Sequence, residues 1–265
     1  MALVNKVIPF SCIDGPGNRT AIFFQGCNFK CTYCHNPETI NVCVDCGKCV
    51  NVCPVGALTK EDKKVKWDKK ICVDCDACIR CCNHLSTPKV TDYTVDELFE
   101  EIKEISPFIQ GITVSGGECT LHAKFLIQLF RKVKNELNLT CFADTNGGVD
   151  LADYKELVEL TDKFMLDVKS IDNEEHLKVV GVDNTVVLKN LNYLLEQDKL
   201  YEVRTVIAPN MNNDKTVKEI SKLINGKCRY KFNAYRKHGV RKEGLDFHGE
   251  IGTSNEVIEE LKKYL

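Results

Sequence analysis

The 265-residue sequence predicts an α/β fold in which six parallel strands alternate with helices and a small cysteine-rich segment interrupts the alternation. Two observations lead to this prediction. From residue 93 onward, short apolar runs alternate with amphipathic helical patterns, which is typical of βαβ units. Twelve of the sixteen cysteines lie between Cys27 and Cys82, where such patterns are weak. We assign residues 1–39 and 93–265 to one large domain and residues 40–92 to an insert.

The strands and helices of the large domain follow in order. A buried strand is expected at 19–25, and Thr94 and Glu97 form a capping box that starts a helix ending at Ser106-Pro107. Further strands are predicted at 111–115, 139–144, 164–168, 201–208 and 228–232, and further helices at 124–137, 150–160, 185–195, 214–224 and 255–264. Six units fall short of the eight that close a full barrel, so we expect an open, partial (β/α)6 barrel. Ligands of such sheets bind at the carboxyl ends of the strands.

Composition argues against several functions. The formal net charge is −2 and no basic stripe with interleaved aromatic residues is present, so we expect no nucleic-acid partner. No apolar run approaches the roughly 18–20 residues that a membrane span requires, and the N-terminus lacks the apolar core of a signal peptide. We therefore expect a cytoplasmic protein without membrane contact. Because that compartment keeps thiols reduced, the clustered cysteines indicate metal binding and not disulfide bonds.

Three cysteines, Cys27, Cys31 and Cys34, form a C-x3-C-x2-C motif directly after the first predicted strand, with Tyr33 before the last cysteine. Three thiolates can hold three corners of a cubane [4Fe–4S] cluster, whereas a structural cluster normally has four cysteine ligands. The missing fourth ligand leaves one iron free to bind a small molecule. The motif therefore predicts a cluster that takes part in chemistry as well as in electron transfer.

The predicted insert carries a second cysteine pattern, C-x2-C-x2-C-x3-C, which is repeated after 29 residues. The duplication resembles the bacterial two-cluster ferredoxin, in which the fourth cysteine of each run ligates the other run's cluster. This resemblance assigns one [4Fe–4S] cluster to Cys43, Cys46, Cys49 and Cys82, and the other to Cys72, Cys75, Cys78 and Cys53. Such clusters would relay single electrons, and in so small a segment they would also act as its core.

Two points about the predicted insert have an alternative: the metal that it binds and the fourth cysteine ligand of the second run. C-x2-C pairs are also the usual signal of zinc sites, although the spacing and Pro54 after the first run favour iron and sulfide. In the second run Asn83 stands in place of that proline, and Cys81 competes with Cys82 as the fourth ligand. Cys82 preserves the spacing and is the predicted ligand.

Around the three-cysteine motif, the sequence resembles the radical S-adenosylmethionine (SAM) enzymes that activate glycyl radical enzymes, as pyruvate formate-lyase activating enzymes do. The resemblance covers nearly the whole chain, and the insert is similar to that of the subgroup with two additional clusters. Any one motif alone would be weak, but they occur together and in order. The motifs are Asp14-Gly15-Pro16-Gly17-Asn18-Arg19, Phe24-Gln25-Gly26-Cys27, Cys34-His35-Asn36-Pro37, Ser115-Gly116-Gly117-Glu118, Asp144-Thr145-Asn146-Gly147, Asp167-Val168-Lys169 and Val203-Arg204-Thr205-Val206.

This resemblance implies a radical SAM barrel and an activase. SAM would bind the open iron of the Cys27, Cys31 and Cys34 cluster, and one electron would cleave it. The resulting 5′-deoxyadenosyl radical would remove a Cα hydrogen from a glycine of a partner glycyl radical enzyme. The insert would feed electrons inward from a flavodoxin or ferredoxin donor. The implied cofactors are three [4Fe–4S] clusters, SAM and a monovalent cation.

The resemblance also assigns cofactor contacts to individual residues. The backbone of Gly116 and Gly117, with Glu118, would bind the SAM amino group, and Arg204 and Lys169 would face its carboxylate. Tyr33 would lie near the adenine, and Asp144, Thr145 and Asp167 would bind a monovalent cation. Relatives have a histidine near SAM in the loop after the last strand, and either His238 or Arg236 would take its place. Cys119 stands where relatives have proline, from which we expect a changed turn but a retained site.

Other interpretations fit part of the sequence. A radical SAM enzyme acting on a small molecule or RNA would need a substrate pocket, for which the chain has little extra sequence. A ferredoxin-like electron carrier would have no use for an open iron. Taken singly, Asp167 and Lys169 could form a surface ion pair, Asp144 could be a turn residue, and Arg204 a surface residue. A solvated loop is the alternative for His238.

Overall fold

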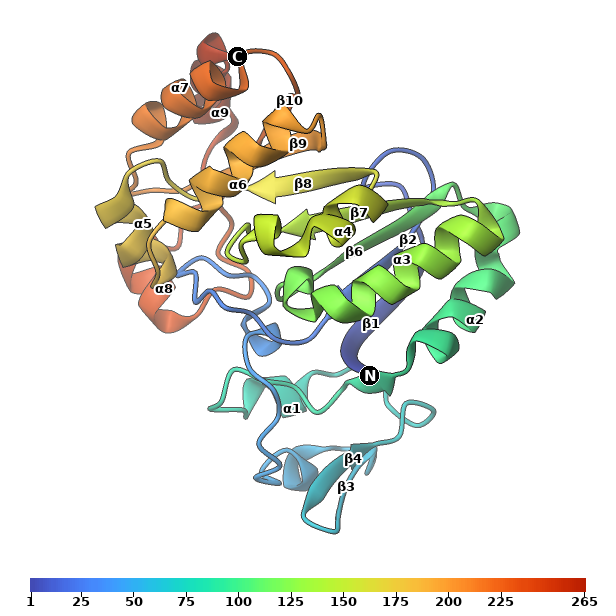
Figure 1. The fold of residues 1–265 in the computed structure, drawn as a ribbon. Helices are drawn as coiled ribbons and strands as arrows, with labels where there is room; N and C mark the ends of the chain where they lie inside the picture. Colours follow the sequence, from blue (N-terminus) through green and yellow to red (C-terminus); the bar gives the residue numbers. More distant parts are fainter.

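The computed structural model describes residues 1–265 and is built around one eight-stranded sheet (Figure 1). Six strands run parallel in the order β10-β9-β8-β7-β6-β2, and they are the six strands that the sequence predicts. Their bounds are Arg19–Phe24 for β2, Gly111–Gly116 for β6, Thr140–Thr145 for β7, Lys163–Asp167 for β8, Leu200–Ile207 for β9 and Arg229–Ala234 for β10. β10 forms one edge and pairs only with β9, so the sheet stays open.

Two antiparallel strands, which the sequence patterns did not reveal, extend the sheet beyond β2. β1 (Ala2–Ser11) pairs with β2, and β5 (Thr91–Tyr93) pairs with the first residues of β1. The pairing of β1 with β2 shifts register twice, and such bulges disturb the period-2 pattern of a regular strand. β5 lies at the end of the segment predicted as the insert and returns the chain to the sheet.

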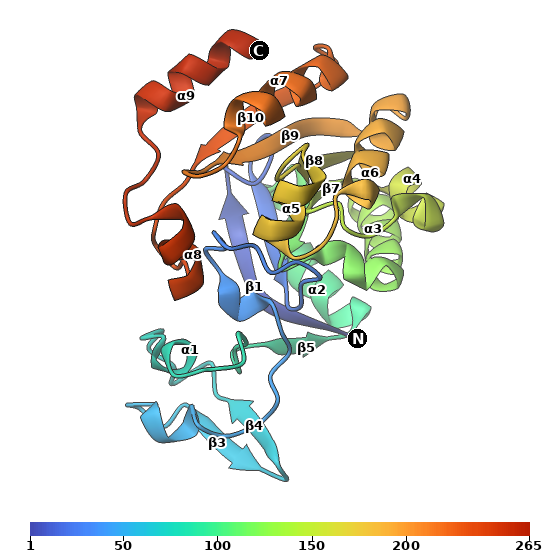
Figure 2. The ribbon, with the colours of Figure 1, turned by 90° about the vertical axis from the view of Figure 1, so that its left-hand side faces the viewer.

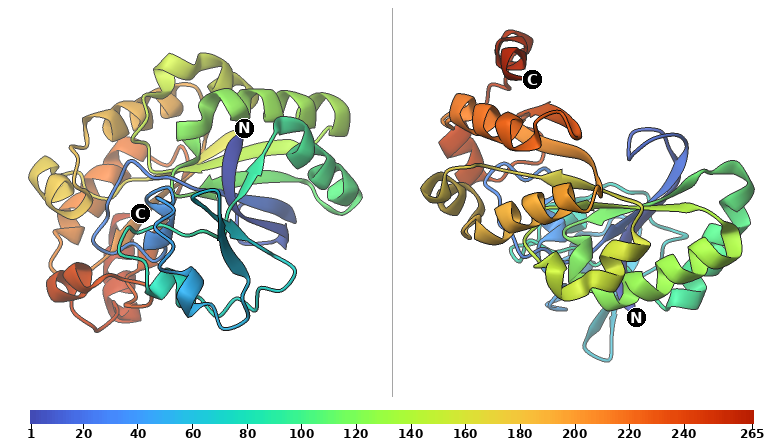
Figure 3. Two further views of the ribbon diagram at one scale, coloured as in Figure 1. Left: turned by 90° about the horizontal axis from the view of Figure 1, so that it is seen from below. Right: turned by 45° about the horizontal axis from the view of Figure 1, so that its top comes forward.

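Helices line the outer side of the sheet; seen from below they form an arc, and the blue segment that follows β2 lies inside it (Figure 3). Five of the predicted helices correspond to α2 (Val95–Ile105), α3 (Ala123–Leu137), α6 (Thr185–Glu196), α7 (Asn213–Ile224) and α9 (Asn255–Leu261). The Thr94–Glu97 capping box of α2 is confirmed. The helix predicted at 150–160 is a short 3-10 turn followed by α4 (Lys155–Leu160), and α5 (Asn173–Val180) and α8 (Lys242–His248) were not predicted. No helix combines the length and apolar character that crossing a membrane requires.

Between residue 40 and β5 the chain forms a small unit below the sheet (Figure 2). It contains a hairpin of β3 (Leu58–Glu61) and β4 (Lys64–Trp67) and the short helix α1 (Ala77–Arg80). The sequence duplication is repeated in the backbone, because Asp45 and Asp74 occupy equivalent positions and have left-handed φ angles of +54° and +50°. The buried core of this unit comprises only Cys49, Leu58 and Cys78, so apolar burial alone offers it little stability.

Candidate active site and cysteine-lined cavities

The three-cysteine motif lies in a loop after β2 that distant segments hold in place. The backbone N–H groups of Lys30 and Thr32 donate to carbonyl groups at the end of α5, at 3.0 and 2.8 Å. Arg241, directly before α8, donates from Nη2 to the carbonyl oxygens of Lys30 and Cys31 at 3.1 and 3.2 Å. The loop is therefore held by hydrogen bonds from both α5 and the segment before α8.

The thiols of Cys27, Cys31 and Cys34 are partly buried in this loop. Burial raises the pKa of Cys27 to about 12 and that of Cys31 to about 11, and the neighbouring thiols add to both shifts, whereas Lys169 opposes the shift at Cys31. A bound cationic centre would be needed to hold these groups as thiolates at neutral pH. Cys119 is engaged elsewhere, since its Sγ donates to a carbonyl at the end of β7 at 3.3 Å. The donor set fits a cluster with three protein ligands.

Gly116 and Gly117 place the end of β6 against the cysteine loop. Gly116 has a φ of +120°, and a Cβ there would lie 2.2 Å from the backbone nitrogen of Phe24. A Cβ on Gly117 would lie 2.3 Å from the carbonyl oxygen of Gly26, which accepts the N–H of Glu118 at 2.8 Å. Only glycine permits this approach of two backbones.

The Glu118 carboxylate is buried and joins the Gly116 loop to the loop after β7. It accepts the N–H and hydroxyl of Thr120, the hydroxyl of Thr145 and the N–H of Asn146, at 2.6 to 2.9 Å. Burial raises the pKa of Glu118, and the hydrogen bonds oppose that rise. Asn146 in turn donates from Nδ2 to the Sγ of Cys27 at 3.6 Å. Glu118 therefore connects the three motifs of the site.

Five charged residues from β7, β8, β9 and the residues just after β8 form two separate groups of ion pairs. Arg204 donates to Asp144 at 3.0 Å and to Glu202 at 2.7 Å, and the Nζ of Lys169 lies 2.6 Å from Asp167. These are not surface pairs, because the side chains of Lys169 and Arg204 are only 10% and 13% exposed. Burial raises the pKa of Asp144 to about 6, with Arg204 opposing the shift and Asp167 adding to it.

Tyr33 and the loop after β10 complete the surroundings of the cysteine loop. Tyr33 is buried, its hydroxyl has no hydrogen-bond partner, and its ring centroid lies 6.0 Å from the Nζ of Lys169. Arg236 and His238 both have exposed side chains. Their loop touches the cysteine loop through the carbonyl of Arg236, which accepts from His35 Nε2 at 2.9 Å.

Sequence reasoning missed two residues of α8 that contact the cysteine loop. A Cβ on Gly244 would lie 1.8 Å from the carbonyl oxygen of Thr32, so the helix and the loop are in close backbone contact. His248 is buried, and its Nδ1 and Nε2 lie 2.8 Å from the Pro209 carbonyl and the Thr32 hydroxyl. Because Nδ1 must donate to that carbonyl, Nε2 accepts from Thr32. The available sequence signal is a glycine inside a helix-forming run, which indicates a packing constraint.

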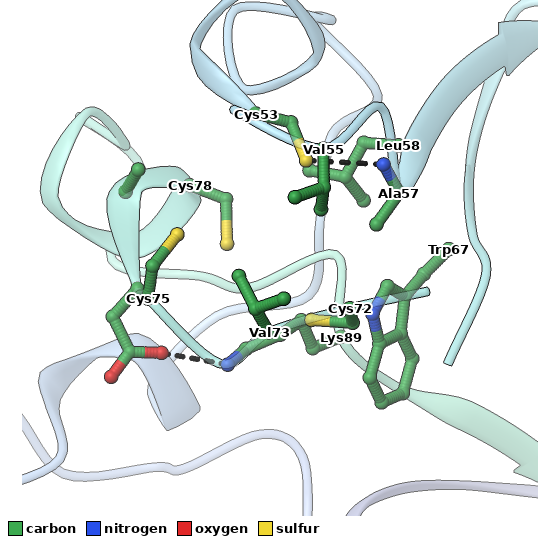
Figure 4. A pocket seen from close by; sticks show the side chains of 12 residues that line it. Cys53, Val55, Ala57, Leu58, Trp67, Cys72, Val73, Cys75, Cys78 and Lys89 are labelled. Carbon is green, nitrogen blue, oxygen red and sulfur yellow. Dashed lines mark hydrogen bonds and ion pairs between the residues drawn. The ribbon is translucent and has the colours of Figure 1, made fainter. Parts of the chain in front are cut away.

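The insert contains two cavities, each lined by the four cysteines that the ferredoxin resemblance groups together. One is lined by Cys53, Cys72, Cys75 and Cys78, whose side chains face a common space (Figure 4). The other is lined by Cys43, Cys46, Cys49 and Cys82, with Cys78 and Cys81 also at its wall. The thiols surround these spaces, and nowhere do three or more His, Cys, Asp or Glu side chains come close enough to share a single ion.

Comparison with known proteins identifies the family. Residues 21–224 match the model of the Radical SAM superfamily. The trans-4-hydroxy-L-proline dehydratase activating enzyme of Clostridioides difficile is 32% identical over 238 residues, which cover 84% of this chain and 78% of the relative. The chain belongs to the glycyl-radical enzyme activating enzymes of the radical SAM superfamily. Membership implies a [4Fe–4S] cluster and SAM as cofactors.

A further relative agrees with this assignment, and a solved structure shares the fold. The pyruvate formate-lyase 1-activating enzyme of Escherichia coli K12 is 32% identical over 223 residues, covering 81% of this activating enzyme and 72% of the relative. The crystal structure of Streptococcus suis SuiB shares the fold, with a TM-score of 0.58 and 14% identity over 91% of this chain and 43% of SuiB.

Proposed function

We propose that this activating enzyme places a radical on a glycine of a partner glycyl radical enzyme. The observation that carries the proposal is the loop of three thiols, held beside Gly116 and next to buried charges at the strand ends. Cys27, Cys31 and Cys34 would hold a cluster that supplies one electron for splitting SAM into methionine and the 5′-deoxyadenosyl radical that takes the glycine Cα hydrogen. The chain's own residues hold the two cofactors next to each other.

Within the site, we assign the SAM amino group to the backbone of Gly116 and Gly117. The Glu118 carboxylate already accepts four hydrogen bonds, so it positions that backbone. Arg204 and Lys169 would neutralise the SAM carboxylate, and Tyr33 would lie near the adenine, with its unpartnered hydroxyl free to donate to a ligand. The loop of Arg236 and His238 would face the partner's glycine.

The charge of the site supports a monovalent cation. Asp144, Glu202 and Asp167 supply three carboxylates, whereas Arg204 and Lys169 supply two cations. When all five are ionised, one negative charge remains uncompensated in a largely buried site. We place the cation beside Asp144 and Asp167. Thr145 would hold the turn next to it, because its hydroxyl donates to Glu118 and accepts from the N–H of Gly147.

We further propose that the insert is a ferredoxin-like unit with two [4Fe–4S] clusters, one in each cysteine-lined cavity. The first cavity is lined by three thiols of the second run and by Cys53 of the first, and the second cavity by three thiols of the first run together with Cys82, Cys81 and Cys78 of the second. Both linings include the four cysteines that the arrangement of two-cluster ferredoxins would group together. Cys82 is the proposed ligand, because it preserves the C-x2-C-x2-C-x3-C spacing of the first run. The unit would pass electrons from a flavodoxin or ferredoxin to the Cys27 cluster.

The test begins with the cluster-loaded protein, SAM and dithionite under anaerobic conditions. We expect 5′-deoxyadenosine, and we expect Cys31→Ala to abolish its formation while both insert clusters remain visible by EPR. Mixing the wild-type protein with a glycyl radical enzyme encoded beside its gene should then produce the doublet EPR signal of a glycyl radical. Formation of 5′-deoxyadenosine without any such signal would favour a small-molecule substrate. No cleavage at all would favour an electron carrier.

A further inference from the structure

The single tryptophan of the chain, Trp67, has a buried indole nitrogen without a hydrogen-bond partner. Trp67 ends β4, where its backbone pairs with Leu58 of β3, and its side chain packs against the small core of the insert. A buried indole N–H usually has an acceptor, because leaving it unpaired costs free energy. An acceptor is therefore expected in the space that this nitrogen faces.

That space is the cavity of Cys53, Cys72, Cys75 and Cys78. Trp67 lines this cavity, and in Figure 4 the edge of the indole that carries the nitrogen faces Cys72. The other nitrogen-bearing side chain at the wall is Lys89, which is engaged with Asp74 and Asp76 at 3.1 and 2.6 Å. Apart from these residues and the thiols, the wall is made of Val, Ala and Leu side chains. The indole is thus the one side-chain N–H at the wall without an acceptor.

The second cavity has no buried indole: the nitrogen-bearing side chains at its wall are Lys48 and His84, and both are exposed. The residue 29 positions before Trp67 is Glu38, which does not line the cavity of Cys43, Cys46, Cys49 and Cys82. The wall there instead includes Ser86, whose Oγ lies 3.4 Å from the Sγ of Cys82. The duplication has therefore left the two cavities chemically different.

We propose that the Trp67 indole N–H donates a hydrogen bond to a sulfur atom of the cluster held by Cys53, Cys72, Cys75 and Cys78, and that this bond raises the reduction potential of that cluster. One-electron reduction makes the cluster sulfur more negative, so a donated hydrogen bond stabilises the reduced state more than the oxidised state. This inference rests on the proposed two-cluster insert and names a residue that tunes one of the two clusters.

The position of the Cys53, Cys72, Cys75 and Cys78 cavity indicates the direction in which a raised potential would move electrons. Trp67 and Cys72 also line a larger open cavity between the insert and the main domain, of about 550 Å³, whose wall includes Gly116 of the candidate active site. No cysteine of the second cluster lines it. A raised potential on the cluster that borders this space would draw electrons to it from the other insert cluster.

The experiment is an EPR-monitored redox titration in the Cys31→Ala background, in which only the insert clusters remain. Trp67→Phe should lower one of the two midpoint potentials by about 59 mV, which corresponds to a tenfold change in the reduction equilibrium of a one-electron couple. The other potential should stay unchanged. Lys66→Ala, at an exposed neighbouring position, is the matched control and should move neither potential.

A second variant covers the case in which Trp67→Phe fails to load clusters. Because the chain has one tryptophan, growth on β-(3-benzothienyl)alanine replaces that residue alone and exchanges the N–H for sulfur with little change of shape. The same fall of one potential is expected. Two loaded clusters with unchanged potentials in the tested variants would overturn the role of Trp67. Absence of insert-cluster signals from the parent protein would overturn the two-cluster proposal and this inference with it.

Discussion

At the scale of single residues, the charges of the active site are buried in pairs that contribute little to folding. Arg204 lies between Asp144 and Glu202, and Lys169 lies next to Asp167. The cost of taking such ions out of water roughly offsets their attraction, whereas removing one partner costs about 3–5 kcal/mol. These pairs are therefore better explained as a means of holding charge ready for a ligand than as a source of stability.

Glu118 should instead matter for stability, because its carboxylate joins the Gly116 loop to the loop after β7. In Glu118→Gln, an amide NH2 group would replace one carboxylate oxygen and would face N–H or O–H donors that now donate to that oxygen. Because these buried donors would lose their acceptor, we expect a loss of about 1–3 kcal/mol in the free energy of unfolding. Urea denaturation of the cluster-free protein measures it. Glu104→Gln, with the same charge change at an exposed position, should leave the urea midpoint nearly unchanged. Equal midpoints for both variants would contradict the connecting role of Glu118.

His248 should make stability depend on pH. Burial lowers its pKa, while the hydrogen bond to the Pro209 carbonyl opposes that shift. The unfolded chain therefore binds the proton at higher pH than the folded protein does. His248 therefore contributes fully to stability at pH values above its pKa in the unfolded chain, about 6.5. This contribution is lost as the pH falls below that value, because protons then bind preferentially to the unfolded chain.

Urea denaturation at pH 7.5 and 5.5 checks this expectation. The drop in stability between the two pH values should be smaller in His248→Gln than in the wild type. The variant should still lose some stability at the lower pH, because burial also lowers the pKa values of His122 and His176. His238→Gln changes an exposed histidine and should leave the drop as it is. An identical drop in all three proteins would exclude a contribution from His248.

At the scale of elements, prediction from sequence succeeded where local patterns decide the structure. The six parallel strands and the cap of α2 carry their own signals. β1 is bulged, and α8 is short and contains Gly244, so tertiary contacts decide both. The motifs likewise lie in loops that the sheet brings close together. They could not show that the Glu118 side chain is engaged, because two of its partners lie 27 and 28 positions away in sequence.

The contact of α8 with the cysteine loop gives a prediction at this scale. Gly244→Ala would introduce a Cβ only 1.8 Å from the Thr32 carbonyl oxygen, so α8 must move away and the loop loses part of its support. We expect weaker loading of the Cys27 cluster, measured as iron and sulfide per chain in a Cys46→Ala, Cys75→Ala background. Lys242→Ala, at an exposed position of the same helix, should load normally. Equal loading of the two proteins would show that α8 does not position the loop.

At the scale of the whole molecule, the chain combines an open parallel sheet with a unit that has almost no apolar core. The sheet brings the cysteine loop, Gly116 and the buried charges together at its carboxyl edge. The insert lies below the sheet (Figure 2), and both line an open cavity of about 550 Å³. If the insert and the main domain act as separate units, a substitution in the insert could stop the electron supply and leave the chemistry of the main domain intact.

Cys46→Ala tests this separation. Removing one ligand of the Cys43, Cys46, Cys49 and Cys82 cavity should interrupt the relay, because its cluster would lose a required thiolate. With a reduced flavodoxin or ferredoxin as donor, we expect glycyl radical formation to fall at least tenfold. With dithionite, which can reduce the Cys27 cluster directly, 5′-deoxyadenosine formation should remain near the wild-type rate. Val44→Ala, an exposed residue at the wall of the same cavity, should retain activation by the protein donor. If Cys46→Ala accepts electrons from that donor as fast as Val44→Ala does, the insert serves the fold and not the electron supply.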